Sequence, residues 1–165
     1  NLADDLGIRI IQLAGYDVYY EDSTEETKKY FEENLRKCVD MASEKGIILA
    51  FETMETEFMN TIQKAMYYVN KIDSPYLQVY PDCGNVTNAC VKYNCDILKD
   101  FESGKGHIAS VHLKETVPGK FREITFGTGH VDFKSVIKKS LDLEIKEVNI
   151  RIKNINAKKE NVVKE

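Results

Sequence analysis

Long hydrophobic runs are missing from the sequence. The longest, such as residues 46–51, are far too short to cross a bilayer, and the first residues lack the basic-then-apolar pattern of a secretory signal. Clustered Lys and Arg are missing outside the tail, the net charge is −4 and the pI is near 5.5. We therefore expect a cytoplasmic protein that binds neither membranes nor nucleic acid.

The four cysteines form no CxxC pair and show no Cys/His spacing typical of a zinc knuckle. We expect them to be reduced and mostly buried. Linkers rich in Gly, Ser or Pro are absent as well, so the sequence predicts one domain. With 165 residues, 42% of them hydrophobic and 30% charged, the chain is long enough to bury a hydrophobic core.

Apolar runs alternate with amphipathic segments along most of the chain. The runs predict buried parallel strands at residues 8–13, 47–51, 77–80 and 108–111. A helix is expected to begin after Thr24, the predicted N-cap, with Thr27 at the capping-box position, and to end before Gly46. Further helices are expected at about residues 57–71, 89–101 and 131–140. Strands that alternate with helices, without hairpin signals, predict βαβ units and a parallel sheet.

The pattern changes after residue 140. Residues 145–152 alternate between apolar and polar types, and residues 154–161 are polar without a helical stripe. This stretch is expected to be either an exposed edge strand or a poorly ordered tail.

Three potential metal ligands, Glu52, Asp82 and His112, each follow a predicted strand. They stand 30 residues apart, which is one βα unit each time. Because the carboxyl ends of successive parallel strands converge on one face, we expect the three side chains to meet there. Each residue alone could cap a helix or fill the core, but three in register favour a site for Mn²⁺, Zn²⁺, Co²⁺ or Mg²⁺.

Five segments resemble a known family. They are residues 6–20 (LGIRIIQLAGYDVYY), 50–60 (AFETMETEFMN), 79–85 (VYPDCGN), 111–116 (VHLKET) and 119–129 (GKFREITFGTG). All five are similar to motifs of bacterial L-ribulose-5-phosphate 3-epimerases, also called L-xylulose-5-phosphate 3-epimerases, and the similarity extends over about residues 1–140. These enzymes resemble xylose isomerase in fold. The resemblance therefore implies an α/β fold that is part of a (β/α)₈ TIM barrel, about strands 4 to 7 with their helices.

The resemblance also implies roles for single residues. Glu52, Asp82 and His112 would hold the divalent metal, and Glu52 would also act as an acid/base group at C3 of the sugar. Arg122 occupies the place where relatives hold a substrate oxygen, and Asn85 lies where they have a polar residue near the sugar. The expected partner is a small phosphorylated sugar, whose C2 carbonyl a bound dication would polarise.

A fourth ligand of the family has no counterpart here. Relatives end their eighth strand in a Glu that is both metal ligand and partner base, whereas this sequence has Ile152 at or near that place. Glu147 is the only nearby acid and would lie at the wrong end of the strand. We therefore expect a partial barrel over residues 1–140 and a divergent strand and polar tail over residues 141–165.

Three hypotheses about function follow. The first is an epimerase acting at C3 of a ketopentose 5-phosphate. The second is a truncated, non-catalytic remnant that folds only as an assembly, because a half barrel leaves sheet edges unpaired; a homo-oligomer is expected. The third is a metal-dependent endonuclease of the same superfamily, which the acidic balance and only three histidines disfavour.

Overall fold

The computed structural model describes residues 1–19, 21–145 and 148–150. Within them the elements follow one another as α1 (Leu2–Asp5), β1 (Ile10–Ala14), α2 (Glu25–Ser43), β2 (Ile48–Glu52), α3 (Ile62–Ile72), β3 (Leu77–Tyr80), α4 (Cys83–Tyr93), α5 (Ile97–Ser103), β4 (Val111–Leu113), α6 (Phe133–Asp142) and β5 (Val148–Ile150). No helix of the described residues has the length and apolar character needed to span a membrane.

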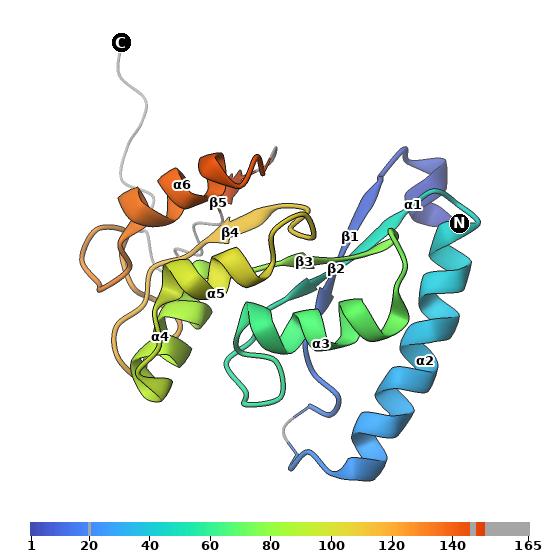
Figure 1. Ribbon diagram of the computed structural model, residues 1–165, viewed down its shortest axis with the longest axis horizontal. Coiled ribbons are helices and arrows are strands. Elements are labelled where there is room, and N and C mark those ends of the chain that lie inside the picture. The colour runs from blue at the N-terminus through green and yellow to red at the C-terminus, as the bar shows by residue number, and fades with distance from the viewer. Residues whose placement is uncertain (20, 146–147, 151–165) are drawn as a thin grey trace, which may run out of the picture.

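All strand pairs of the described residues are parallel, as the alternating pattern predicts. β1 pairs with β2 and β2 with β3, while β4 pairs with β5. Single parallel bridges between Val79 and Ile108 and between Asp82 and His112 join the two groups. The strands thus succeed one another in chain order, with α2 and α3 along β1–β3 and α4, α5 and α6 around β4 and β5 (Figure 1).

The core lies between these strands and helices. Phe51, Val79 and Val111, one from each central strand, are completely buried. Burying a side chain of this size contributes about 1.5–3 kcal/mol relative to leaving it in water. The helices contribute matching fully buried side chains: Ile62, Val86, Phe101 and Val136.

An aromatic cluster fixes α2 and the loop after β2. The ring of Phe31 on α2 lies 6.0 Å from Phe51, 5.0 Å from Phe58 and 5.1 Å from Tyr68, measured between centroids. Rings packed edge-on or offset at these distances add about 0.5–1.5 kcal/mol beyond the area they bury. The loop that follows Glu52 is therefore held against both neighbouring helices.

Two local predictions are confirmed closely. Thr24 is the N-cap of α2: its side chain accepts from the Thr27 N–H, and the Thr27 side chain accepts from the Thr24 N–H. The strand predicted at residues 77–80 is β3 with the same bounds. The predicted strands at 8–13 and 47–51 are displaced by one or two residues at their ends.

Three predicted elements were wrong in their extent. The helix expected from residue 57 begins only at Ile62, because Thr61 caps it. The helix expected over 89–101 is two helices, since Asn94 adopts a left-handed conformation that ends α4 and Asp96 then caps α5. The fourth strand was expected at 108–111, but only an isolated bridge forms at Ile108 and β4 is Val111–Leu113.

All four cysteines are free thiols, as expected, but only half of them are buried. Cys83 and Cys90 are buried within α4, whereas Cys38 and Cys95 are exposed. Cys38 lies on the outer side of α2, whose buried stripe consists of Leu35, Val39 and Ala42. The expectation that the thiols are mostly buried was therefore wrong.

The N-terminus of α3 depends on a carboxylate from another helix. Asp100 of α5 is buried and accepts hydrogen bonds from the N–H groups of Ile62 (2.8 Å) and Gln63 (3.1 Å). We expect Asp100→Ala to lower the free energy of unfolding by about 1–3 kcal/mol, because two amides then lose a charged acceptor. Urea unfolding followed by circular dichroism measures this.

Asp22→Ala is the matched control, because Asp22 is exposed in a loop. Asp100→Asn keeps one acceptor oxygen and should lose less than the alanine variant. Equal midpoints for wild type and Asp100→Ala would show that α5 does not hold α3 in this way.

Candidate metal centre

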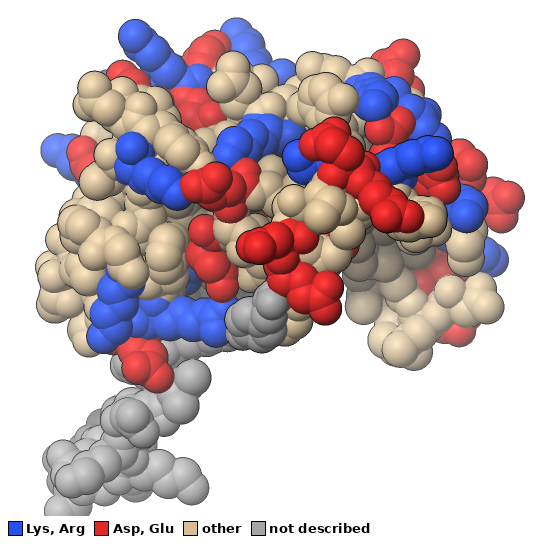
Figure 2. Space-filling view, turned by 90° about the horizontal axis from the view of Figure 1, so that it is seen from below, with Lys and Arg blue, Asp and Glu red and all other residues tan. Residues whose placement is uncertain are grey.

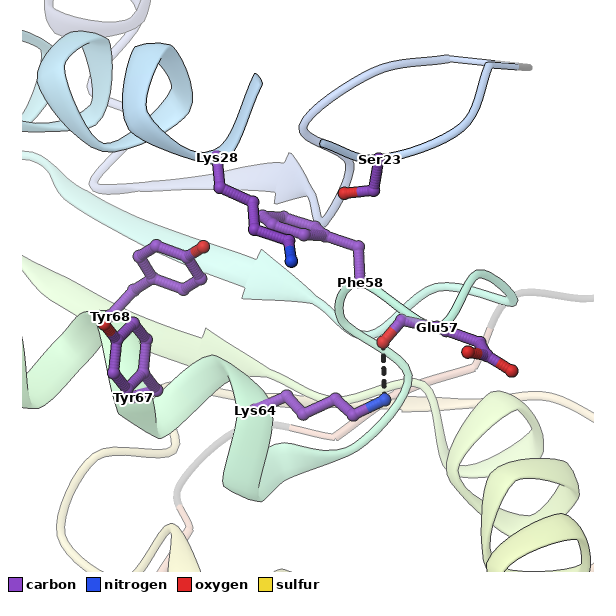
Figure 3. Close-up of a pocket in the computed structure, with 7 residues that line it drawn as sticks. All are labelled: Ser23, Lys28, Glu57, Phe58, Lys64, Tyr67 and Tyr68. Atoms are coloured by element: carbon purple, nitrogen blue, oxygen red, sulfur yellow. Dashed lines mark hydrogen bonds between the residues drawn. The ribbon is translucent and has the colours of Figure 1, made fainter. Parts of the chain in front are cut away.

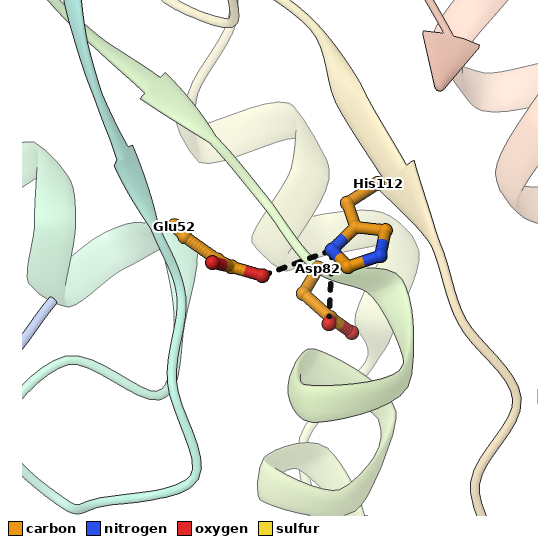
Figure 4. A group of neighbouring side chains, drawn as sticks. All are labelled: Glu52, Asp82 and His112. Atoms are coloured by element: carbon orange, nitrogen blue, oxygen red, sulfur yellow. Dashed lines mark hydrogen bonds and ion pairs between the residues drawn. The ribbon is translucent and has the colours of Figure 1, made fainter. Parts of the chain in front are cut away.

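Three elements position the side chains of Glu52, Asp82 and His112. Glu52 is the last residue of β2, Asp82 is the N-cap of α4, and His112 is the middle residue of β4. The His112 N–H donates to the Pro81 carbonyl, which aligns β4 with the end of β3. The three side chains point toward one another at the carboxyl ends of the strands (Figure 4). The structure thus brings together the three residues that the 30-residue spacing singles out.

The donor atoms lie at separations that suit a common metal ion. His112 Nδ1 is 2.9 Å from Glu52 Oε1 and 3.2 Å from Asp82 Oδ2. Two donors that each lie about 2.1 Å from one ion, at a right angle, are about 3.0 Å apart. All three ligand atoms lie within 4.8 Å of one another. Two carboxylates and an imidazole therefore fit a divalent ion at this point.

Asp82 is the most deeply buried of the three. Its side chain is 1% exposed, against 7% for His112 and 15% for Glu52. One oxygen, Oδ1, accepts from the Asn85 N–H at 2.9 Å and caps α4, which leaves Oδ2 for the site. Burial raises the pKa of Asp82, and the charges of Lys114 and His112 offset part of that effect.

Two buried polar atoms of the cluster lack a hydrogen bond. They are Oδ2 of Asp82 and Nε2 of His112. Asp82 Oδ2 nevertheless has a charged partner, because Lys114 Nζ lies 2.8 Å away in an ion pair, whereas His112 Nε2 has no hydrogen-bond partner. A buried carboxylate oxygen that faces both an ammonium group and an imidazole is a position where a cation is stabilised.

Asn85 lies in the first turn of α4, and both the nitrogen and the oxygen of its side-chain amide are hydrogen bonded. Its Nδ2 donates to the Thr53 carbonyl at 2.8 Å, and its Oδ1 accepts from Lys114 Nζ at 2.6 Å. The residue is 2% exposed. Lys114 therefore connects Asn85 to Asp82, a link that the sequence does not reveal because the two partners lie about 30 positions before it in the chain.

Arg122 is held by an acidic residue that the sequence analysis did not single out. Its guanidinium donates to Glu55 Oε1 at 2.8 Å, while Tyr16 donates to Glu55 Oε2 at 2.6 Å. Burial would raise the pKa of Glu55, but the Tyr16 hydrogen bond and the charges of Arg122 and Lys114 keep it below its usual range. The loops after β1 and β2 and the segment after β4 are joined in this way.

A cavity of about 610 Å³ opens beside this network. Its lining comes from the loops after β1 and β2 and includes Tyr16, Asp17, Tyr19 and Glu55. Burial and the neighbouring Glu55 carboxylate raise the pKa of Tyr16, so its hydroxyl remains a hydrogen-bond donor. On the face seen from below, acidic and basic side chains are interspersed (Figure 2).

Glu115 organises the segment that carries Arg122. Its buried carboxylate accepts from the backbone N–H groups of Thr116, Gly127 and Val131, at 2.9–3.2 Å. A Cβ on Gly129 would come 2.3 Å from Glu115 Oε1, so this position requires glycine. Gly127, which donates its N–H, and Gly129, which leaves room for the carboxylate, therefore let the chain turn around Glu115.

A second cavity, of about 410 Å³, lies between α2 and α3 and does not include the cluster. Seven residues line it: Ser23, Lys28, Glu57, Phe58, Lys64, Tyr67 and Tyr68 (Figure 3). Its two lysines are already engaged, Lys28 with Glu25 and Lys64 with the Glu57 carbonyl and Asn60. We therefore place the chemistry at the strand ends and not in this cavity.

Among the described residues, the group formed by Glu52, Asp82 and His112 is the one set of three acidic, His or Cys side chains close enough to hold a metal. Glu147 and Ile152, the positions considered for a fourth ligand, lie outside the described residues. So does the polar stretch at 154–161.

The chain is similar in sequence to curated relatives over most of its length. It is 44% identical over 131 residues to L-ribulose-5-phosphate 3-epimerase UlaE of Shigella boydii serotype 18, and 45% identical over 133 residues to the Salmonella paratyphi C protein of that name. These alignments cover 79% and 81% of the chain. The chain spans about half the length of these relatives, 45% in both cases.

Solved structures agree on the fold. An L-ribulose 3-epimerase superposes with a TM-score of 0.75 at 18% identity, over 91% of this chain and 50% of that one. D-allulose 3-epimerase from Methylomonas sp. gives 0.73 at 19% identity, over 90% and 51%. The IolI protein, whose structure contains a bound zinc atom, gives 0.70 at 17% identity, over 90% and 55%.

The family comparison covers most of the chain. The model of the xylose isomerase-like TIM barrel family matches residues 1–148. Those residues include every described helix and strand except the last two residues of β5, and all three members of the metal cluster. The chain belongs to the xylose isomerase-like TIM barrel family.

Proposed function

We propose that this chain is the metal-holding part of an enzyme that epimerises C3 of a ketopentose 5-phosphate, such as L-ribulose or L-xylulose 5-phosphate. The observation that carries the proposal is the convergence of Glu52, Asp82 and His112 at the strand ends, in a chain 44–45% identical to L-ribulose-5-phosphate 3-epimerases. Mn²⁺, Zn²⁺, Co²⁺ and Mg²⁺ all suit two carboxylates and one imidazole.

A bound dication would polarise the C2 carbonyl of the sugar and so lower the cost of removing the C3 proton. Within this chain, Glu52 is the group that can accept that proton. Asp82 is 1% exposed and uses one oxygen to cap α4, whereas Glu52 is 15% exposed and caps no helix. The more exposed carboxylate is the one that a substrate can reach.

Arg122 and Asn85 are proposed to bind the sugar. Arg122 lies where three loops meet, paired with Glu55 beside the cavity of about 610 Å³. Asn85 reaches the cluster through Lys114. An anionic group of the substrate, such as a phosphate, can replace the Glu55 carboxylate as the partner of Arg122. A guanidinium group binds phosphate and carboxylate oxygens in the same two-pronged geometry.

Epimerisation also needs a proton donor on the opposite face of the sugar, and the described residues supply no fourth acid to the cluster. We therefore propose that residues 1–140 form the partial barrel domain, that 141–165 diverge from it, and that this chain alone turns over little substrate. The alternative is a non-catalytic remnant that folds only as an assembly.

We also propose that the protein is cytoplasmic and self-associates. Among the described strands β1 has a partner on one side only, and nearby Leu2, Leu6 and Ile8 are exposed at 72%, 65% and 44%. An unpaired strand edge beside exposed apolar side chains favours association with another copy. Light scattering on the purified wild-type chain measures the oligomeric state, and a monomer would contradict this proposal.

Metal binding tests the proposal. Titration calorimetry with Mn²⁺ and Zn²⁺ should show one site per chain in the wild type. Asp82→Asn should bind at least about 100-fold more weakly, because the variant keeps an oxygen to cap α4 but loses the ligand charge. Asp22→Asn, in an exposed loop, is the matched control.

Equal affinities of wild type and Asp82→Asn would contradict the assigned ligand set. The same metal-loaded samples can be incubated with L-xylulose 5-phosphate. Rapid epimerisation by the wild type would overturn the expectation of low turnover, and Glu52→Gln should then abolish it.

A further inference from the structure

Lys114 lies where it can take the place of a metal ion. It directly follows β4, two residues beyond His112, and alternate residues of an extended segment face the same side. Its Nζ is 2.8 Å from Asp82 Oδ2, the same oxygen that lies 3.2 Å from His112 Nδ1. The ammonium group and a metal bound to the cluster would therefore share one carboxylate oxygen.

The charge of Asp82 explains why a lysine is found there. A carboxylate that is 1% exposed is costly to keep ionised without a neighbouring cation. Lys114, itself 22% exposed, supplies that cation, and Asn85 holds the ammonium in place at 2.6 Å.

We propose that Lys114 is the internal counter-ion of the metal-free site and competes with the divalent metal for Asp82. This inference rests on the proposed metal centre. Two cations that share one oxygen repel each other strongly in a poorly hydrated site, so metal binding displaces the ammonium group.

Mn²⁺ calorimetry on wild type, Lys114→Met and Lys114→Arg tests the competition. Lys114→Met should bind Mn²⁺ at least tenfold more tightly, because no cation has to be displaced, and Lys114→Arg should stay near wild type. Lys120→Met, an exposed lysine in the following segment, is the matched control. Equal or weaker binding by Lys114→Met would overturn the proposal and show that Lys114 orients Asp82 in the loaded site.

Thermal unfolding provides a second readout that does not depend on calorimetry. Lys114→Met should lower the Tm of the metal-free protein more than that of the Mn²⁺-saturated protein, because only the former needs the counter-ion. Binding by Lys114→Met without binding by wild type supports the competition. Absence of binding in every variant overturns the metal centre and this inference together, whereas wild-type binding that Lys114→Met does not improve overturns the inference alone.

A separate observation concerns Cys90 and Cys95. Asn94 ends α4 in a left-handed conformation, with φ 52° and ψ 46°, and the Cys95 N–H donates to the Cys90 carbonyl at 3.0 Å. This is the Schellman arrangement, which brings the side chains at these two positions into contact. The two sulfur atoms lie 2.8 Å apart. Cys95 is exposed, while Cys90 is buried.

We infer that Cys90 and Cys95 form a disulfide when a hydroperoxide is present. The exposed Cys95 thiolate takes one oxygen atom from the hydroperoxide to give a sulfenic acid, with water or an alcohol as the other product. The Cys90 thiol then attacks the Cys95 sulfur, and the S–S bond forms as water leaves. Burial raises the pKa of Cys90, which assigns the first step to Cys95 and the second to Cys90.

Tryptic peptide mapping after hydrogen peroxide treatment tests this pair. Lys92 lies between the two cysteines, so the disulfide would join peptide 72–92 to peptide 93–99 with a loss of two hydrogens. The link should form in wild type and Cys83→Ser and be absent in Cys95→Ser and in dithiothreitol-treated protein. Oxidation of Cys95 to sulfinic acid at the rate of the exposed Cys38, without a linked peptide, would overturn the inference.

Discussion

Asp82 carries a carboxylate that the fold has almost removed from water, and the arrangement of the site follows from that burial. One oxygen is satisfied by the N-terminus of α4, and the other requires a positive charge. His112 of β4 and Lys114, which directly follows β4, both reach this second oxygen. A buried anion of this kind is stable only with a counter-charge at hand. Asp82 therefore needs either the Lys114 ammonium group or a bound metal ion beside its second oxygen.

Parallel strand pairing meets this requirement. Because β2, β3 and β4 run in the same direction, their carboxyl ends bring Glu52, Asp82 and His112 to one point. The apolar residues that precede them, such as Phe51 and Val79, are completely buried and fix the strands in register. Packing of the core and geometry of the site therefore have the same origin.

Much of this arrangement could be predicted from the sequence, because the relevant signals are local. Apolar runs marked β2 and β3, and the Thr24–Thr27 pair marked the start of α2. The regular spacing of Glu52, Asp82 and His112 predicted that they would meet. The resemblance to epimerases pointed to the fold that the family match and the solved structures show.

Features set by single backbone conformations or by distant partners could not be predicted. Asn94 ends α4 through a left-handed conformation that an amphipathic pattern does not exclude, so two helices were predicted as one. The role of Glu55 depends on contacts with Tyr16 and Arg122, which lie 39 and 67 positions away in the chain. The partnership of Lys114 with Asp82 is likewise a tertiary contact.

The most direct test of the account is electron spin-echo spectroscopy of Mn²⁺ bound to the chain, with His112→Gln and His130→Gln for comparison. The account predicts coupling to one directly bound imidazole nitrogen in wild type and in His130→Gln, and its loss in His112→Gln. Bound Mn²⁺ without nitrogen coupling in wild type, or coupling that persists in His112→Gln, would contradict the metal centre described here.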